Sequence, residues 1–231
     1  MILMIFVNDL WSLQNIPCWL GHVYANEDGM GLADVVFPAF LFIVGLSLPY
    51  STDNRRARGD SDLQLFGHVV WRTVALIIMG VFLVNGETIN GQATGVPRLA
   101  WNSICCLSFI LIWNSYPSSV NRMVMWALRA TAIIALVTLA IIYRGGDEGS
   151  LYRFGTHWWG ILGLIGWAYL VAATVTILAR NRIGIIVAAW AFFSLISILF
   201  HAGYIPDALS FLPGPIVRGT LTALTLGGVA T

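Results

Sequence analysis

The sequence predicts an all-α protein, a polytopic bundle of about seven to eight transmembrane helices that forms a single domain over residues 1–231. Hydrophobic residues make up 58% of the chain and charged residues only 10%, whereas soluble domains contain about 25% charged residues. The mean hydropathy is +0.80. Because a soluble protein of this length could not hide so much apolar surface, we expect an integral membrane protein that is solvated by the lipid bilayer.

Apolar runs between charged residues give the predicted helices in order: 1–9, 32–50, 65–85, 100–116, 123–143, 157–179, 183–200 and 215–231. The first run has seven apolar residues before Asn8, which form about 10 Å of helix against a hydrocarbon core of about 30 Å. It lacks the basic segment and the cleavage site of a signal peptide. We therefore expect it to be the second half of a span. The last run also stops while it is still apolar, so the domain is expected to be incomplete at both ends.

Two of these runs contain residues that predict local helix geometry, a proline in one and a series of glycines in the other. In 32–50, Pro38 is expected to kink the helix and to release a backbone carbonyl near Asp34, which favours an aqueous cavity there. In 157–179, aromatic residues are followed by Gly160, Gly163 and Gly166, which are small residues of the kind through which membrane helices pack closely.

The distribution of arginines predicts the orientation in the membrane. If the N-terminus is cytoplasmic, six arginines lie in cytoplasmic loops, namely Arg55, Arg56, Arg58, Arg122, Arg180 and Arg182. The opposite loops contain three, Arg98, Arg144 and Arg153. Positive residues favour the cytoplasmic side, so we expect this orientation, with the loop of His22 on the extracytoplasmic face.

Composition excludes several classes of function. The net charge of +1 gives no basis for binding nucleic acid. The chain contains no lysine, which excludes a Schiff-base or P-loop lysine. Cys18, Cys105 and Cys106 form no metal-binding or disulfide pattern, and we interpret them as packing residues. His22, His157 and His201 lie near the predicted outer face without the spacing of a zinc site, so no metal is expected.

Asp34 and His22 are the first candidates for chemistry. A carboxylate near the start of an apolar span usually faces a cavity or a partner, although an acid in the first turn can also simply cap the helix. His22 lies in a loop, where catalytic residues are common, and histidine exchanges protons near neutral pH. It could also be incidental. Asn8 and Asp9 end the first run at the same face, either as functional groups or as a polar helix terminus.

Arg72 and Arg129 lie inside predicted spans. Arg72 falls about two turns into the run 65–85, on its cytoplasmic side, and Arg129 enters 123–143 in a similar way. Each could extend to the headgroups. The alternative is that they line a cytoplasmic vestibule and bind an anion such as phosphate.

Several segments together resemble a known family. "MIFVNDLW", then His22, then "GLADVVFPAFLFIVGLSLPYS" is similar to the start of the heparan-α-glucosaminide N-acetyltransferase family and its bacterial relatives. In that family a span ends in Val-Asn, a loop carries a histidine, and the next span opens with Ala-Asp, two hydrophobic residues and Phe-Pro. Val7-Asn8, His22 and 33–38 match these positions. "RTVALIIMGVFLVNG", with Arg72, and "WWGILGLIGWAYLVA" also resemble bacterial members.

The resemblance implies acetyl transfer across a membrane. Cytoplasmic acetyl-CoA, as the cosubstrate, would donate its acetyl group to an amine or hydroxyl of a sugar or glycan on the far side. His22 would be the base or the acetyl carrier, with Asn8 as its partner. Asp34 would hold the tautomer of the histidine, as the carboxylate of a catalytic triad does. Arg72 would attract the phosphates of CoA.

Two features depart from the family pattern. The spacing from Asn8 to His22 includes extra residues, and "NED" at 26–28 adds an acidic insert, so we expect a different acceptor pocket. The family has about eleven spans, so we expect the last spans to be missing from this chain. The resemblance to bacterial members predicts a location in the bacterial inner membrane, and we also consider a homodimer as an assembly.

A function from another class is a secondary transporter or permease, with Asp34 and Asp9 as proton-coupling carboxylates. Transporters often contain inverted repeats and broken helices, and the sequence shows one proline-containing candidate without a matching partner. A third alternative is a membrane scaffold without catalytic activity.

Overall fold

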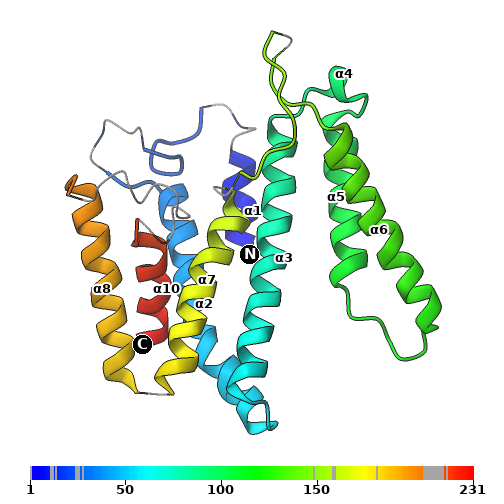
Figure 1. Ribbon diagram of the computed structural model, residues 1–231. Helices are drawn as coiled ribbons and strands as arrows, with labels where there is room; N and C mark the ends of the chain where they lie inside the picture. The colour runs from blue at the N-terminus through cyan, green and yellow to red at the C-terminus, as the bar shows by residue number, and fades with distance from the viewer. Residues whose placement is uncertain are drawn as a thin grey trace. The chain divides into compact units, whose positions relative to one another are not determined.

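The computed structural model describes residues 2–10, 13, 15–23, 27, 29–147, 149–157, 160–180, 182–204, 216 and 218–231, with only the backbone of Asn8. Within these residues the regular elements are helices and no strand is formed (Figure 1). The helices are α1 Ile2–Asp9, α2 Leu32–Ala57, α3 Asp62–Glu87, α4 Gly91–Thr94, α5 Arg98–Trp113, α6 Arg122–Ile142, α7 Ile161–Ala179, α8 Ile183–His201 and α10 Thr220–Ala230.

Among the described residues, five helices are long and apolar enough to cross a membrane, namely α2, α3, α6, α7 and α8. This confirms the predicted helical membrane protein. The apolar helices α5 and α10 have 16 and 11 residues, fewer than the roughly 20 that span a bilayer. Helices also extend beyond the apolar runs: α2 continues through Pro38, Pro49 and the polar residues up to Ala57 as one helix. The four-residue helix α4 was not predicted.

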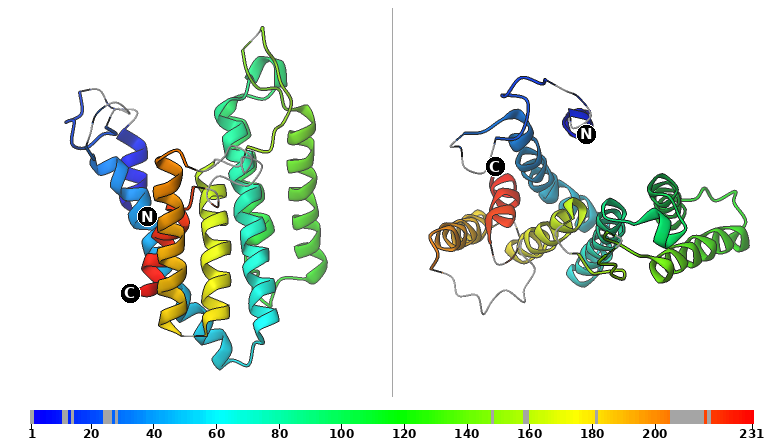
Figure 2. Two further views of the ribbon diagram at one scale, coloured as in Figure 1. Left: turned by 60° about the vertical axis from the view of Figure 1, so that its left-hand side comes forward. Right: turned by 90° about the horizontal axis from the view of Figure 1, so that it is seen from above.

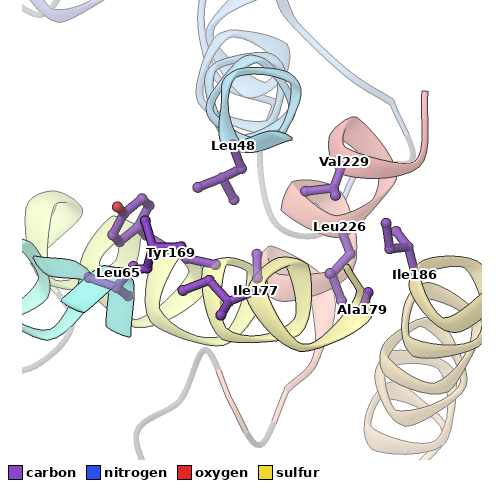
Figure 3. Packing of buried hydrophobic residues seen from close by; sticks show 11 residues of the cluster. Leu48, Leu65, Tyr169, Ile177, Ala179, Ile186, Leu226 and Val229 are labelled. Atoms are coloured by element: carbon purple, nitrogen blue, oxygen red, sulfur yellow. The ribbon is translucent and has the colours of Figure 1, made fainter. Parts of the chain in front are cut away.

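The helices form two compact units. We call residues 1–73 with 165–231 the first unit and residues 74–164 the second unit; α3 and α7 contribute residues to both. The core of the first unit collects apolar side chains from five helices (Figure 3). Leu48, Leu65, Tyr169, Ile177 and Leu226 converge there, each at most 7% exposed.

Helix α10 packs between α2 and α8 in the first unit (Figure 2). A Cβ atom placed on Gly45 of α2 would meet the carbonyl oxygen of Thr225, and one placed on Gly228 of α10 would meet the carbonyl oxygen of Phe42. The two backbones are therefore in contact, which only small residues at this crossing permit.

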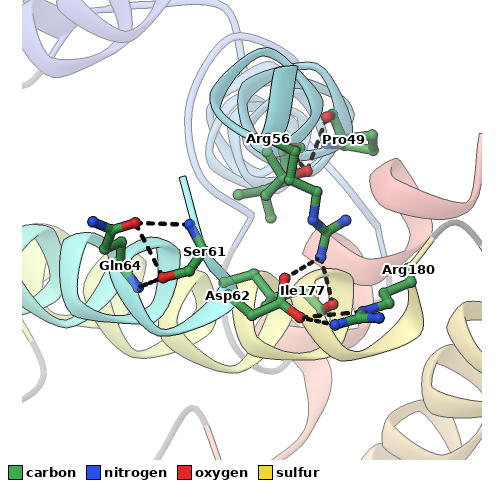
Figure 4. Close-up of polar contacts among 9 residues, drawn as sticks. Pro49, Arg56, Ser61, Asp62, Gln64, Ile177 and Arg180 are labelled. Atoms are coloured by element: carbon green, nitrogen blue, oxygen red, sulfur yellow. Dashed lines mark hydrogen bonds and ion pairs between the residues drawn. The ribbon is translucent and has the colours of Figure 1, made fainter. Parts of the chain in front are cut away.

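Charged residues join the ends of three helices of the first unit, in a group that we call the charged clamp: Arg56, Asp62 and Arg180. One carboxylate oxygen of Asp62 accepts from Arg56 Nη2 at 3.1 Å, and the other accepts from Nε of Arg180 at 3.1 Å. Arg56 Nη2 also donates to the carbonyl of Ile177 at 2.8 Å (Figure 4). The clamp ties the end of α2 to the start of α3 and to the end of α7, and the Asp62 carboxylate raises the pKa of the Arg180 guanidinium.

The second unit contains the hairpin of α5 and α6, and aromatic side chains fill its core. Phe82, Trp101, Phe109 and Tyr143 are buried there, and Trp101 donates from its indole Nε1 to the carbonyl of Phe82 at 3.2 Å.

The predicted close packing of small residues is confirmed for Gly160 and Gly163. A Cβ atom on Gly80 of α3 would meet the backbone of Gly163, and one on Gly160 would meet Val84 and Gly80. Gly166 is buried.

The two ends of α2 separate the candidate site from the clamp. Asp34 lies in the first turn of α2 and Arg56 in its last turn. The helix has 26 residues, or about 39 Å at 1.5 Å per residue. His22, which contacts Asp34, and the loop that begins beyond Arg56 therefore lie at opposite ends of α2, as the sequence predicts.

Candidate functional site

The loop before α2 folds back onto the start of that helix. The backbone N–H of Leu20 donates to Pro17 at 2.9 Å, and the N–H of Leu32 donates to the carbonyl of Trp19 at 2.7 Å. A Cβ atom on Gly31, the residue that precedes α2, would meet the carbonyl oxygen of Gly21. Residue 31 therefore has to lack a side chain for the loop to lie this close.

This fold brings His22 against Asp34. Nδ1 of His22 lies 2.6 Å from Oδ1 of Asp34. The other oxygen, Oδ2, accepts from the backbone N–H groups of Val23 at 3.1 Å and Gly31 at 3.0 Å. The His22 side chain is 50% exposed and that of Asp34 is 27% exposed. The pair is thus accessible from outside while its acid is held by three donors.

Both sequence interpretations of Asp34 hold at once. Its carboxylate accepts from the N–H of Gly31, one of the donors that a helix start leaves without an intrahelical partner. The same carboxylate contacts the imidazole of His22. One side chain therefore caps α2 and orients the histidine.

The contact determines which ring nitrogen of His22 is suited to chemistry. An ionised carboxylate can only accept hydrogen bonds, so in the neutral imidazole the hydrogen is assigned to Nδ1. Nε2 is then the basic nitrogen. This is the arrangement in which a carboxylate fixes the tautomer of a histidine that acts as a general base.

Helix α1 packs beside this site. Val7 and Leu10 form a buried cluster with Ala33 and Val36 of α2. The backbone of Asn8, between Val7 and Leu10, is therefore close to the first turns of α2. The side chain of Asn8 lies outside the described part of the structure. Asp9 is exposed at the end of α1.

Arg72 lies within α3, in the part of this helix that belongs to the first unit, and its side chain is exposed. Its guanidinium is 5.2 Å from the centre of the Tyr169 ring, a cation–π distance. His68 precedes it by one helical turn, and His68 Nε2 is 3.1 Å from Arg55 Nη2. Arg55 also pairs with Asp60 at 3.1 Å.

Sequence reasoning missed Arg55 and His68 as neighbours of Arg72. The spacing of four residues from His68 to Arg72 was a usable signal, because it places both on one face of α3. The contact from Arg55 depends on how α2 meets α3, which the sequence pattern does not specify.

Arg129 has a different environment. Its guanidinium lies 5.6 Å from the ring of Tyr116 and 5.7 Å from that of Trp126. It donates to the carbonyl of Asn114 at 3.4 Å. These contacts are those of an arginine that secures the connection between α5 and α6.

The other histidines and the cysteines show no further site. His201 Nδ1 contacts the carbonyl of Ser197 at 2.8 Å, and His157 packs against the ring of Tyr152. Cys18 and Cys106 are exposed and Cys105 is buried. Within the described residues no three His, Cys, Asp or Glu side chains are grouped so that they could hold a metal ion.

The fold and the site together define a helical membrane protein with an accessible histidine–carboxylate pair at the start of one span. Residues 10–203 match the family described as "Domain of unknown function (DUF5009)", and the protein belongs to this family. No solved structure matches the chain.

Two curated relatives match part of the chain. Heparan-alpha-glucosaminide N-acetyltransferase of Mus musculus is 37% identical over 108 residues, which are 45% of this chain and 14% of the mouse protein. The Homo sapiens protein of the same name is 36% identical over 108 residues, with the same shares of the two chains. The match therefore covers about one seventh of each relative.

Proposed function

We propose that this protein is a membrane acetyltransferase that moves an acetyl group from acetyl-CoA to an amine or hydroxyl of a sugar or glycan. The observation that carries the proposal is the contact of His22 with Asp34 at 2.6 Å, at an accessible helix start. The names of the two relatives support the reaction class, since both are N-acetyltransferases acting on a glucosaminide.

His22 would be the proton carrier of the reaction. Acetyl-CoA would supply an acetyl thioester. Nε2 of His22 would take the proton of the acceptor while the acceptor bonds to the acetyl carbon, and would return it to the sulfur when the carbon–sulfur bond breaks. Asp34 would stabilise the imidazolium between these two steps.

His22 could instead carry the acetyl group itself. We favour the base, with donor and acceptor bound together, because an acetylated imidazole is labile beside water and half of the His22 side chain is exposed.

Asn8 would assist His22. Its amide would donate to the negative oxygen that develops on the acetyl group, or would orient the imidazole. The packing of Val7 and Leu10 against Ala33 and Val36 supports this role, because it keeps the backbone of Asn8 beside the first turns of α2.

Arg72 would bind a phosphate of CoA. The Arg72 guanidinium is exposed and lies over the Tyr169 ring, whereas Arg55, which contacts His68, is already paired with Asp60. Charge-assisted hydrogen bonds from arginine to phosphate are among the stronger ones in proteins. The opposite ends of α2 would then separate the CoA headgroup from the chemistry at His22.

The transporter remains the alternative, with Asp34 and Asp9 as proton carriers. The geometry favours acyl transfer. Three donors from the loop and the helix start hold the Asp34 carboxylate, an arrangement suited to positioning a histidine. We place His22 on the extracytoplasmic face of a bacterial inner membrane, following the arginine distribution and the resemblance to bacterial members.

Transfer of radiolabelled acetyl from acetyl-CoA to glucosamine tests the proposal. We expect His22→Ala to lose at least about a hundredfold in rate, since general base catalysis contributes about 10²–10⁴-fold, while it retains acetyl-CoA affinity. His201→Ala is the matched control, because His201 contacts a carbonyl at the end of α8. Equal rates for wild type and His22→Ala would remove His22 from the mechanism. Label retained by the protein with donor alone would favour an acetyl carrier.

A further inference from the structure

Arg129 is a charged residue inside a helix that can cross a membrane, and no step of the proposed reaction uses its charge. It lies in α6, seven residues after the first residue of that helix, Arg122, or about 10 Å along the axis at 1.5 Å per residue. Ionised side chains within spans usually pair with an opposite charge or face a water-filled cavity. The guanidinium of Arg129 therefore needs an anionic partner.

The hairpin of α5 and α6 supplies no anion for Arg129. From Thr88 to Gly146, a segment that includes both helices and their connection, the sequence contains no aspartate or glutamate. The ion pairs found within the described residues do not include Arg129. Its positive charge is therefore not compensated within the hairpin.

Aromatic rings hold the guanidinium at the end of the hairpin where α5 is connected to α6 (Figure 1). It lies 5.6 Å from the centre of the Tyr116 ring and 5.7 Å from that of Trp126, both cation–π distances. Tyr116 is itself held, because its hydroxyl donates to the carbonyl of Leu111 at 2.8 Å. Arg129 also donates to the carbonyl of Asn114. A group that is already held in this way loses little conformational freedom when a ligand binds.

Most of the hydrogen-bonding capacity of Arg129 is unused. A guanidinium has five N–H groups, and the hydrogen bond that Arg129 makes within the described residues is the long one from Nη2 to Asn114, at 3.4 Å. Nε is enclosed and has no acceptor among these residues, so an incoming oxygen has to bind at the Nη atoms. Phosphate oxygens are acceptors that arginine binds especially well, because its planar N–H groups match their geometry.

The face of α6 that continues from this site is apolar and exposed. Ile133 and Val137 follow Trp126 by seven and eleven residues, a spacing that places the three side chains on one face of a helix. Each of them is at least 50% exposed. A partner that carries both a phosphate and a hydrocarbon chain would cover the guanidinium and this apolar stripe together, whereas a free phosphate would cover only the guanidinium.

We propose that this end of the α5–α6 hairpin binds an anionic phospholipid, with phosphate oxygens on the Nη atoms of Arg129 and an acyl chain along Trp126, Ile133 and Val137. Tyrosine and tryptophan are enriched at the depth of the lipid headgroups, and basic sites beside membrane helices bind anionic headgroups. An anionic lipid fits better than a zwitterionic one, because the hairpin has no carboxylate to receive an ammonium group. The proposal does not depend on acetyl transfer.

The test is the binding of phosphatidylglycerol and phosphatidylcholine, with the same acyl chains, to the full chain in detergent. Native mass spectrometry gives the two dissociation constants. We expect phosphatidylglycerol to bind at least about tenfold more tightly, the factor that one hydrogen bond to a charged group provides. Arg129→Gln should lower the affinity for phosphatidylglycerol to that for phosphatidylcholine. Arg98→Gln is the matched control, because Arg98 is an exposed arginine at the other end of α5, and it should retain the preference.

Ile133→Ala with Val137→Ala provides a second variant, which retains Arg129. It should weaken both lipids by similar factors and leave the preference unchanged, since it removes contacts to the acyl chain alone. Equal affinity of the wild type for the two lipids would overturn the proposal, as would wild-type binding of phosphatidylglycerol by Arg129→Gln. Glycerol phosphate that binds as tightly as phosphatidylglycerol, or displacement of the lipid by acetyl-CoA, would identify a site for a soluble phosphate and would also overturn it.

Discussion

At the residue scale, the geometry of the candidate site depends on residue 31 being a glycine, which has no side chain. Gly31 lets the carbonyl of Gly21 approach the start of α2, and the N–H of Leu32 then reaches Trp19 at 2.7 Å. This approach brings both His22 and Val23 to the carboxylate of Asp34. Gly31 is therefore a positioning residue for the proposed base.

Gly31→Ala should displace the loop and separate His22 from Asp34. A misplacement of about 1 Å can cost about 10²-fold in rate, so we expect a loss of that order in kcat while acetyl-CoA affinity is retained. Gly29→Ala is the matched control, because its Cβ would meet only Val23 side-chain atoms at 3.7 and 3.8 Å. Wild-type kcat in both variants would show that the loop is not held by this contact.

Arg72→Ala should weaken acetyl-CoA binding by about 1.5–3 kcal/mol, the value of a hydrogen bond to a charged group. Equilibrium binding of labelled acetyl-CoA to the purified protein measures it. Arg122→Ala serves as the control, since Arg122 is an exposed arginine at the start of α6. If both variants bind as the wild type does, Arg72 extends to the headgroups and has no part in the site.

Part of this site could be predicted from the sequence. Asp34 stands out because a carboxylate inside an apolar run needs a partner, and His22 is a histidine in the loop that precedes it. The contact of Gly21 with Gly31 could not be predicted. The contact depends on how the loop between these residues folds, and a glycine in the sequence does not indicate which segment of backbone will pack against it.

At the element scale, α2 and α10 cross with their backbones in contact. Gly45 and Gly228 face carbonyl oxygens of the opposite helix, and Leu48, Leu226 and Val229 pack beside them (Figure 3). Close packing at small residues is a main source of helix association in membranes, because burial of apolar surface alone contributes little free energy of association there.

Gly228→Ala should therefore destabilise the first unit. Its Cβ would meet the Phe42 carbonyl, and overpacking of this kind costs about 1–3 kcal/mol. Gly184→Ala, at a helical glycine with open space around it, should be neutral or stabilising by up to about 1 kcal/mol. The measurement is the midpoint of thermal unfolding in detergent. A lower midpoint for Gly184→Ala than for Gly228→Ala would contradict the crossing.

The sequence predicted the order of the helices well and their ends less well. Hydropathy locates the apolar centre of each helix, but hydrogen bonding determines where it ends. Helix α3 begins at Asp62 because Ser61 and Gln64 cap it, with Ser61 N–H donating to Gln64 Oε1 at 2.7 Å. The charged clamp then holds this end of α3 against α2 and α7. The apolar pattern of the sequence does not predict these ion pairs.

At the scale of the whole molecule, the proposed transfer across the membrane requires that the two ends of α2 face opposite sides of it. The helix is about 39 Å long, long enough to cross a hydrocarbon core of about 30 Å. The arginine count predicts that the His22 end is extracytoplasmic.

Cysteine labelling tests this orientation. Cys18 is exposed in the loop of His22, and a membrane-impermeant maleimide should label it in intact cells when Cys106 is replaced by alanine. Arg58→Cys, in a background with Cys18→Ala and Cys106→Ala, should react only after permeabilisation. The reverse pattern would invert the orientation and move the proposed chemistry to the cytoplasm.

We propose that His22 and Asp34 act as one catalytic unit, and a double-mutant cycle on acetyl transfer is the test. We expect His22→Ala and Asp34→Asn each to lower kcat by about 10²-fold or more. The double variant should be no slower than His22→Ala alone, because residues that act as a unit are non-additive. Multiplicative losses, with the double variant slower by the product of the two single effects, would show that Asp34 acts independently of His22 and that the two residues are not one unit.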